Sequence, residues 1–147
     1  MAQDAGSVLR ALFQAINDHD PERVAELAAD DFELIDCATG EKFQGPGGAR
    51  RNAEAWLTPF PDAKVEELNL ISAGDWAVFE GLARATNTGP METPAGPVEP
   101  TGRSLELHFC TIAQVRDGKI AQSRDYYDLT TIMTQLGLMP EAAGATA

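Results

Sequence analysis

A carboxylate in the middle of a strand-like segment is the first candidate for chemistry in this sequence. In the segment IAQSRDYY, alternation places Ser123, Asp125 and Tyr127 on one face of the strand. An acidic side chain inside an apolar strand is costly to bury unless it is paired or has a chemical use. If that face points into an apolar cavity, burial raises the carboxyl pKa and makes Asp125 an acid or base near neutral pH. Such a base removes a proton from carbon next to a carbonyl and leaves an enolate that can close a ring.

Asp125 and three further charged residues also have structural interpretations. If the strand face that carries Asp125 points outward, Asp125 pairs with Arg124 or with a cation of a neighbouring strand. Asp128 precedes an apolar helical segment and is interpreted as its N-cap. Asp36 ends a short strand and is a candidate second carboxylate of the pocket, or a residue of its rim or of a turn. Arg84, in an otherwise apolar strand, is a candidate contact to a substrate oxygen or a member of an ion pair.

The strand predicted at residues 104–115 offers neighbours for that carboxylate. Alternation puts Phe109 and Thr111 on the side predicted to face the core. His108 lies on the other side and is interpreted as a residue of the outer face or of a dimer contact. The large aromatic residues are predicted to fill the core or to wall a cavity, namely Trp56, Phe60, Trp76, Phe79 and Phe109.

The elements that must position these residues follow from apolar spacing and turn residues. Helices come first and antiparallel strands afterwards, which predicts an α+β domain rather than a βαβ dinucleotide fold. A Pro- and Gly-rich stretch at residues 89–102 is interpreted as a long loop that closes the pocket mouth. The predicted elements are helices at residues 8–16, 21 to about 30, about 49–57 and 129–136, and strands at 32–36, 64–72, 76–86, 104–115 and 120–127.

Composition restricts the class of protein. The 147 residues correspond to about one domain, predicted at residues 1–138 with a disordered tail at 139–147. The net charge of −12 and the lack of a basic cluster exclude a nucleic-acid partner. No run approaches the roughly 18 apolar residues of a membrane span, so we expect no membrane partner. With two cysteines and no signal-peptide pattern, a reducing, cytoplasmic location is expected.

Several segments carry a resemblance to a known family. They are NDHDPERVAELAADDFELID, FPDAKVEEL, PTGR before a strand, VRDGKI and the closing DLTTIMTQLG. Together they resemble the SnoaL-like polyketide cyclases, also called ester cyclases, of the nuclear transport factor two-like superfamily. This resemblance implies a cone-shaped α+β barrel, in which N-terminal helices pack on a curved mixed or antiparallel sheet that encloses a pocket. It also implies a homodimer formed through the outer face of the sheet.

The resemblance further implies an acid/base mechanism without a metal or an organic cofactor. The family's catalytic aspartate falls on Asp125, although Ser123 and Arg124 replace the histidine and tryptophan that usually precede it. We therefore expect a cyclase or isomerase type of enzyme that acts on an apolar, carbonyl-containing small molecule. The residues expected to bind that substrate are Asp36, Trp56, Arg84, Phe109, Thr111, Ser123 and Tyr127.

Three other functions remain open from the sequence. The missing His-Trp pair favours a non-catalytic module that binds small molecules in the same fold. A second alternative is an enzyme similar to the ketosteroid isomerases with Asp36 as the base, although Leu12 and Thr111 occupy the positions of that family's oxyanion donors. A third is an epoxide hydrolase of the limonene type, for which Arg84 with Asp36 and Asp125 is the only available set.

Overall fold

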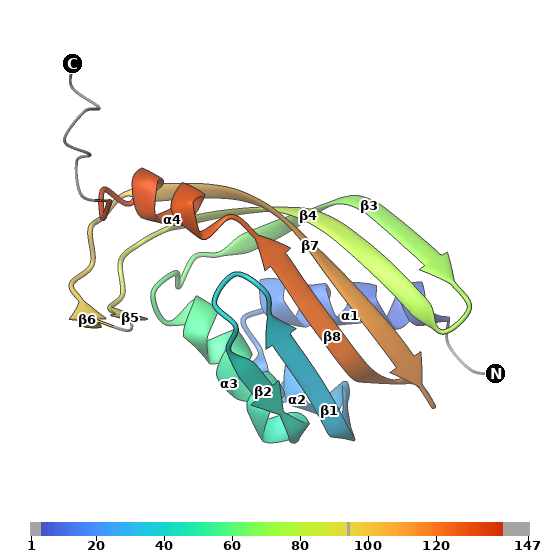
Figure 1. Ribbon diagram of the computed structural model, residues 1–147. Helices are drawn as coiled ribbons and strands as arrows, with labels where there is room; N and C mark the ends of the chain where they lie inside the picture. The colour runs from blue at the N-terminus through green and yellow to red at the C-terminus, as the bar shows by residue number, and fades with distance from the viewer. Residues whose placement is uncertain (1–3, 94, 140–147) are drawn as a thin grey trace.

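A curved six-stranded sheet frames this protein in the computed structural model, which describes residues 4–93 and 95–139 (Figure 1). The strand order is β2-β1-β8-β7-β4-β3, and the sheet does not close on itself. The β1–β8 pair is parallel and the other pairs are antiparallel, so the sheet is mixed. The strands are β1 (Ala28–Asp36), β2 (Lys42–Gln44), β3 (Lys64–Ala73), β4 (Trp76–Thr86), β7 (Ser104–Arg116) and β8 (Lys119–Tyr127), beside a separate hairpin of β5 (Met91–Thr93) and β6 (Gly96–Val98).

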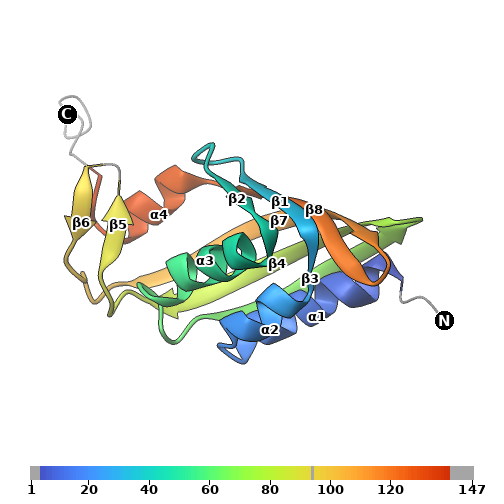
Figure 2. The same ribbon diagram turned by 90° about the horizontal axis from the view of Figure 1, so that it is seen from below.

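Three helices cover one face of the sheet, as Figure 2 shows from the helical side. They are α1 (Ala5–Asn17), α2 (Pro21–Glu26) and α3 (Gly45–Leu57), and a fourth, α4 (Leu129–Gln135), follows β8. Helix α1 buries Val8 and Leu9 completely against the sheet, because apolar residues recur on one side of the helix. The expected α+β architecture, with helices packed on a curved mixed sheet, is confirmed.

Capping side chains begin the helices where the sequence indicates. The Asp20 carboxylate accepts a hydrogen bond from Arg23 N at 3.1 Å, and Pro21 occupies the first helical position. The Asp128 carboxylate accepts one from Thr130 N at 3.0 Å at the start of α4, so its interpretation as an N-cap is confirmed. These bonds satisfy backbone N–H groups that have no partner inside the helix.

The first half of the chain differs from the prediction in three places. Helix α2 ends at Glu26, and β1 begins at Ala28 instead of residue 32, because Ala28 pairs with Ile120 of β8. Strand pairing therefore overrides the helical pattern of this alanine-rich stretch. Strand β2 was not predicted. The glycine-rich segment after it is the first turn of α3, where a Cβ on Gly48 would lie 2.9 Å from the Phe43 carbonyl carbon.

The segment predicted as a long loop contains the β5–β6 hairpin, and a buried amide anchors its base. Asn87 Nδ2 donates to Pro59 O at 3.1 Å and to Gly89 O at 3.0 Å. Asn87 Oδ1 accepts from Thr101 N at 2.8 Å and from the Thr101 hydroxyl at 3.0 Å. One side chain thus joins both ends of the hairpin to the end of α3. Of the tail expected at 139–147, all but Met139 lies outside the described residues.

Replacing this amide should destabilise the fold more than most substitutions. Asn87→Ala leaves several buried polar groups without a partner, and we expect a loss of about 2–4 kcal/mol of unfolding free energy. Chemical denaturation measures that loss. Asn69→Ala, which removes one exposed bond to Glu80, is the matched control and should change stability by less than about 0.5 kcal/mol. Equal effects of the two substitutions would contradict the role given to Asn87.

Candidate active site

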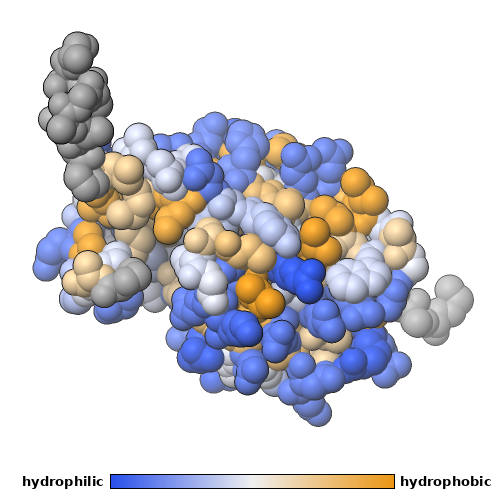
Figure 3. All heavy atoms as spheres, in the orientation of Figure 1, coloured by the Kyte–Doolittle hydropathy of each residue, from blue (hydrophilic) through white to orange (hydrophobic). Residues whose placement is uncertain are grey.

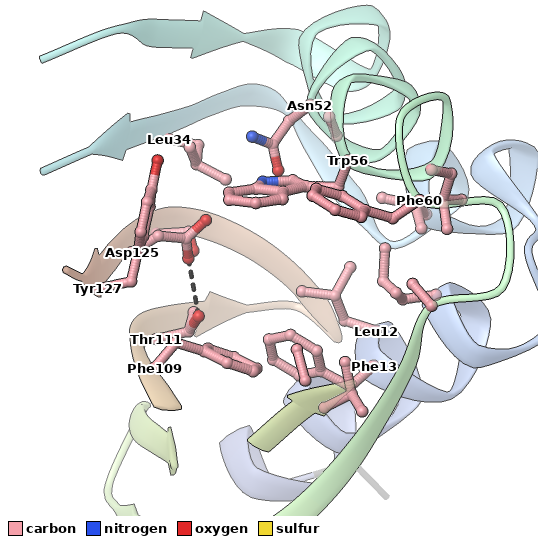
Figure 4. A pocket seen from close by; sticks show the side chains of 18 of the residues that line it. Leu12, Phe13, Leu34, Asn52, Trp56, Phe60, Phe109, Thr111, Asp125 and Tyr127 are labelled. Carbon is pink, nitrogen blue, oxygen red and sulfur yellow. Dashed lines mark hydrogen bonds between the residues drawn. The ribbon is translucent and has the colours of Figure 1, made fainter. Parts of the chain in front are cut away.

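A largely apolar cavity lies between the helices and the concave face of the sheet (Figure 4). Its volume is about 130 Å³, close to that of apolar cavities that hold a single aromatic ring, about 150 Å³. Apolar side chains from α1, α3 and five strands of the sheet form most of the wall. The lining residues with polar side-chain atoms are few, namely Asn52, Trp56, Thr111, Ser123, Asp125 and Tyr127.

Stacked aromatic rings form one part of this wall. The Phe13 ring of α1 stacks on Phe79 with 4.1 Å between centroids and lies 5.4 Å from the Phe109 centroid. Gly81 makes room for this group, because a Cβ there would lie 2.7 Å from a Phe109 ring atom. Trp56 meets the Tyr127 ring edge-on at 5.2 Å. The sequence does not separate core from cavity wall for these aromatic residues; in the structure Trp56 and Phe109 line the cavity and Phe79 lies in the core.

Asp125 extends from β8 into the cavity, where one hydrogen bond from the residues that the structure describes holds its carboxylate (Figure 4). The Thr111 hydroxyl donates to Asp125 Oδ1 at 2.7 Å, from the opposing position on β7. Burial raises the pKa of Asp125 from 3.8 to about 6. The Thr111 bond opposes this rise, whereas the nearby negative charge of Asp36 adds to it. The carboxyl group is therefore able to exchange a proton near neutral pH.

Asp36 lies behind the cavity wall instead of lining it, which corrects its assignment as a substrate-binding residue. Its Oδ2 accepts a hydrogen bond of 2.6 Å from the Tyr127 hydroxyl. Its Oδ1 accepts from Ala38 N at 3.0 Å and from Thr39 N at 3.1 Å, which fixes the turn after β1. Burial and the bond to Asp36 raise the pKa of Tyr127, so this phenol stays protonated. Asp36 therefore orients Tyr127, and the base expected for a ketosteroid-isomerase-like enzyme is not in the cavity.

Ser123 contributes a buried hydroxyl to the same wall. Its residue surface is 2% exposed, and its Oγ has no hydrogen-bond partner among the described residues. Its neighbours across the sheet are Leu34 of β1 and Ala113 of β7, which offer no polar side chain. Unpartnered buried hydroxyls are uncommon and are often explained by a function or a ligand.

Arg84 lies on the outer face of the sheet, so the expectation that it contacts substrate is wrong. Its neighbours Ala83 and Ala85 line the cavity, and alternation turns Arg84 away from it. Arg84 pairs with Glu66 at 2.9 Å and with Glu106 at 3.4 Å. The Asp-Arg-Asp set of an epoxide hydrolase is therefore not assembled. Trp76 is likewise exposed rather than buried in the core.

Asn52 is a polar lining residue that the sequence reasoning missed. Helix α3 directs Ala49, Asn52 and Trp56 to the cavity, at the spacing of one helical face. In Figure 4 the Asn52 side chain extends from α3 toward the cavity with its amide oxygen on the side of Trp56. A half-turn of the carboxamide exchanges the positions of this oxygen and the N–H2 group. A polar residue between Ala49 and Trp56 on one helical face is the available signal, but the sequence does not fix where this helix begins, so it does not show which face points inward.

The segment at residues 89–102 does not cover the cavity as expected. None of its described residues, 89–93 and 95–102, lines the cavity, and the β5–β6 hairpin lies beside α4 in both ribbon views. Met91 of this hairpin packs against a second apolar cluster that includes Phe60, Leu105 and Ile132. Within residues 4–93 and 95–139, no three side chains of His, Cys, Asp or Glu gather as a possible metal site. None of the helices described is long and apolar enough to cross a membrane.

The fold and the cavity define a class of small-molecule-binding α+β proteins, and a comparison with known families identifies the branch. The profile of the SnoaL-like polyketide cyclases matches residues 6–136. This protein belongs to the SnoaL-like polyketide cyclase family. A search of curated proteins gives no match.

Solved structures share this architecture at low sequence identity. IdmH, a candidate polyketide cyclase from Streptomyces antibioticus, is 26% identical, with a TM-score of 0.74 over 92% of this chain and 99% of IdmH. A candidate SnoaL-like polyketide cyclase from Jannaschia sp. CCS1 is 20% identical, with a TM-score of 0.79 over 91% of this chain and 92% of the other. AclR, a candidate hydroxylase from Streptomyces galilaeus, is 19% identical, with a TM-score of 0.76 over 95% of this chain and 89% of AclR. The latter two show the fold alone.

The two groups beside Asp125 should shift its titration in opposite directions. Thr111→Val removes a bond that lowers the pKa, so the pKa of Asp125 should rise above its wild-type value of about 6. Asp36→Asn removes a negative charge, so the pKa should fall. Titration of the carboxyl carbon by NMR measures both shifts. A wild-type pKa near 3.8 would contradict this description of the site.

The same shift makes stability depend on pH. The folded protein holds the Asp125 proton more tightly than the unfolded chain does. The contribution of Asp125 to the free energy of unfolding is therefore fully present below about pH 3.8. It is lost as the pH rises through about 6. Asp125→Asn should accordingly stabilise the protein by up to about 3 kcal/mol above pH 7 and have little effect near pH 3. Denaturation at the two pH values measures this, with Asp128→Asn as a control that keeps the N-cap.

Proposed function

We propose that this protein is a cofactor-independent enzyme of the cyclase or isomerase type, with Asp125 as its acid/base. The observation that carries this proposal is a carboxylate on the wall of a largely apolar cavity, which among the described residues is hydrogen-bonded only by Thr111. No ion pair in the described part of the chain involves Asp125. Its charge is therefore not neutralised by a cation, which favours a chemical use over a structural one.

The geometry of the carboxylate suits proton transfer at carbon. Thr111 holds Oδ1, while Oδ2 has no hydrogen bond among the described residues and is available to a substrate. Asp125 takes a proton from carbon next to a carbonyl, and the resulting enolate either closes a ring or is protonated again at another carbon. The lining around Asp125 is mostly apolar, so the charge that develops is less screened than it would be in water.

The cavity indicates an apolar substrate with a single polar end. Phe13, Phe109 and Trp56 offer ring faces, and the polar lining groups lie on α3, β7 and β8. A carbonyl compound oriented by those groups places its acidic C–H beside Asp125. Thr111, Ser123 and Tyr127 belong to this arrangement as residues that position the base or border the substrate.

A non-catalytic binding module is the second candidate. Ser123 and the exposed Arg124 occupy the positions where the family resemblance implies histidine and tryptophan. Loss of those residues would remove catalytic groups while leaving the cavity. The raised pKa of Asp125 favours the enzyme, because a carboxylate retained only for binding gains nothing from proton exchange near neutral pH.

We further propose that two copies pair through the outer face of the sheet. This face, opposite the helices, carries Ile71 at 60% exposure, Trp76 at 37% and Tyr126 at 41%, with Val78 beside Ile71 in the β3–β4 pair. Figure 3 shows hydrophobic residues among polar ones over this region of the molecule. Exposed apolar surface of this kind favours association. We also retain the proposals of one domain within residues 1–138 and of a cytoplasmic location.

Asp125→Asn should abolish turnover while leaving ligand binding nearly intact. Without a known substrate, NMR can follow exchange of α-hydrogens for solvent deuterium in a panel of apolar single-ring ketones such as acetophenone. The exchange rate should rise with pH through about 6, as the carboxylate forms. We expect a loss of at least about 100-fold in Asp125→Asn. Unchanged exchange in that variant would remove Asp125 from the mechanism.

The pairing of two copies is tested by a charge on the outer face. Ile71→Glu places a carboxylate in the proposed contact and should weaken dimerisation by at least about tenfold. Analytical ultracentrifugation measures this over a range of protein concentrations. Leu129→Glu changes an exposed leucine on α4, away from that face, and should leave the dimer intact. A wild-type protein that remains monomeric at high concentration would contradict the proposal.

A further inference from the structure

The hydrogen-bond donors of the cavity wall are unequally available to a ligand. The Thr111 hydroxyl donates to Asp125 at 2.7 Å, and the Tyr127 hydroxyl donates to Asp36 at 2.6 Å. Each hydroxyl has only one hydrogen to donate. Both donors are therefore committed to carboxylates and cannot serve a substrate oxygen without breaking those bonds.

Three donors of the wall remain without a partner in the part of the chain that the structure describes. They are the Asn52 carboxamide, the Trp56 indole N–H and the Ser123 hydroxyl. The Ser123 oxygen is sealed within the wall, which limits a ligand's access to it. Asn52 and Trp56 lie one helical turn apart on α3 and face the cavity in Figure 4. Asn52 brings two N–H groups on a short side chain, so it is the most available donor.

Removal of a proton next to a carbonyl requires a donor for the carbonyl oxygen. When the C–H bond breaks, its proton goes to the Asp125 carboxylate and its electron pair forms a C=C bond. The carbonyl π electrons move to the oxygen, which becomes negatively charged. In a cavity with few polar groups this charge is costly unless a donor faces it. Asp125 cannot supply that donor, because it has just begun to accept the proton.

We propose that Asn52 binds the carbonyl oxygen of the substrate and stabilises the enolate that forms when Asp125 removes the proton. In Figure 4, Asn52 hangs from α3 on one side of the cavity, whereas Asp125 and Thr111 come from the sheet on another. A flat carbonyl compound between them meets the acceptor at its C–H and the donor at its oxygen. This inference rests on the proposed function and adds to it the group that selects carbonyl compounds.

A pair of ligands with the same shape tests this without turnover. Acetophenone and isopropylbenzene have the same ring and nearly the same outline, but only acetophenone has a carbonyl oxygen. A single ring suits the cavity volume of about 130 Å³. NMR titration of the wild-type protein should give a dissociation constant for each, and acetophenone should move the side-chain amide signals of Asn52 more than isopropylbenzene does.

Asn52→Leu keeps the size of the side chain and removes the donor. We expect acetophenone to bind about tenfold more weakly and isopropylbenzene to change by less than about twofold. Asn52→Asp, which offers acceptors in place of donors, should also weaken acetophenone binding if the leucine variant folds poorly. Asn69→Leu is the matched control on the outer side of the sheet and should alter neither constant.

Three results would overturn the proposal. The first is unchanged acetophenone binding in Asn52→Leu. The second is an equal loss of binding for both ligands in that variant, which a packing role of Asn52 would produce. The third is a wild-type protein that binds neither ligand. None of these measurements depends on proton transfer by Asp125. The carbonyl subsite can therefore fail while Asp125 still exchanges α-hydrogens, and it can hold in a protein that binds carbonyl compounds without turning them over.

Discussion

The pairing of β8 with a strand on each side is the constraint on which the site depends. It aligns Asp36 of β1, Asp125 of β8 and Thr111 of β7 in one row across three strands. This row gives Asp125 its hydrogen-bond donor on one side and a like charge on the other. A slip of one residue would turn the carboxylate to the outer face and bring Arg124 into the cavity. The register of the sheet therefore determines both the position and the pKa of the candidate base.

Much of the fold follows from the sequence because its signals are local. Apolar and polar residues alternate along much of β4, β7 and β8. The side chains of Asp20 and Asp128 cap helix starts, and Gly137 follows α4 with the positive φ that glycine adopts readily. The start of β1 could not be read in the same way. Residues 27–29 favour a helix by composition, but α2 stops before them and the pairing of Ala28 with the distant Ile120 begins β1.

The candidate site was predictable only where alternation applies. That rule puts Ser123, Asp125 and Tyr127 on one face, and the structure places all three at the cavity. It cannot locate Asp36, which shares a strand face with Leu34 but lies past the cavity, where the chain turns. Nor does it reveal that the outer acids Glu66 and Glu106 bind Arg84. Such facts depend on where a strand ends and on which side chains of other strands stand opposite.

The uneven placement of polar groups in the cavity has a stereochemical consequence. A planar enolate has two faces, and in free solution each receives a new bond equally often. Here the polar groups lie on α3, β7 and β8, while the neighbouring rings of Phe13 and Phe109 form an apolar part of the wall. In the proposed reaction, a ligand with its oxygen toward the polar groups and its plane held against the aromatic rings would present one face to Asp125. A prochiral carbonyl compound bound in that way would receive its new bond on that face and give one enantiomer in excess.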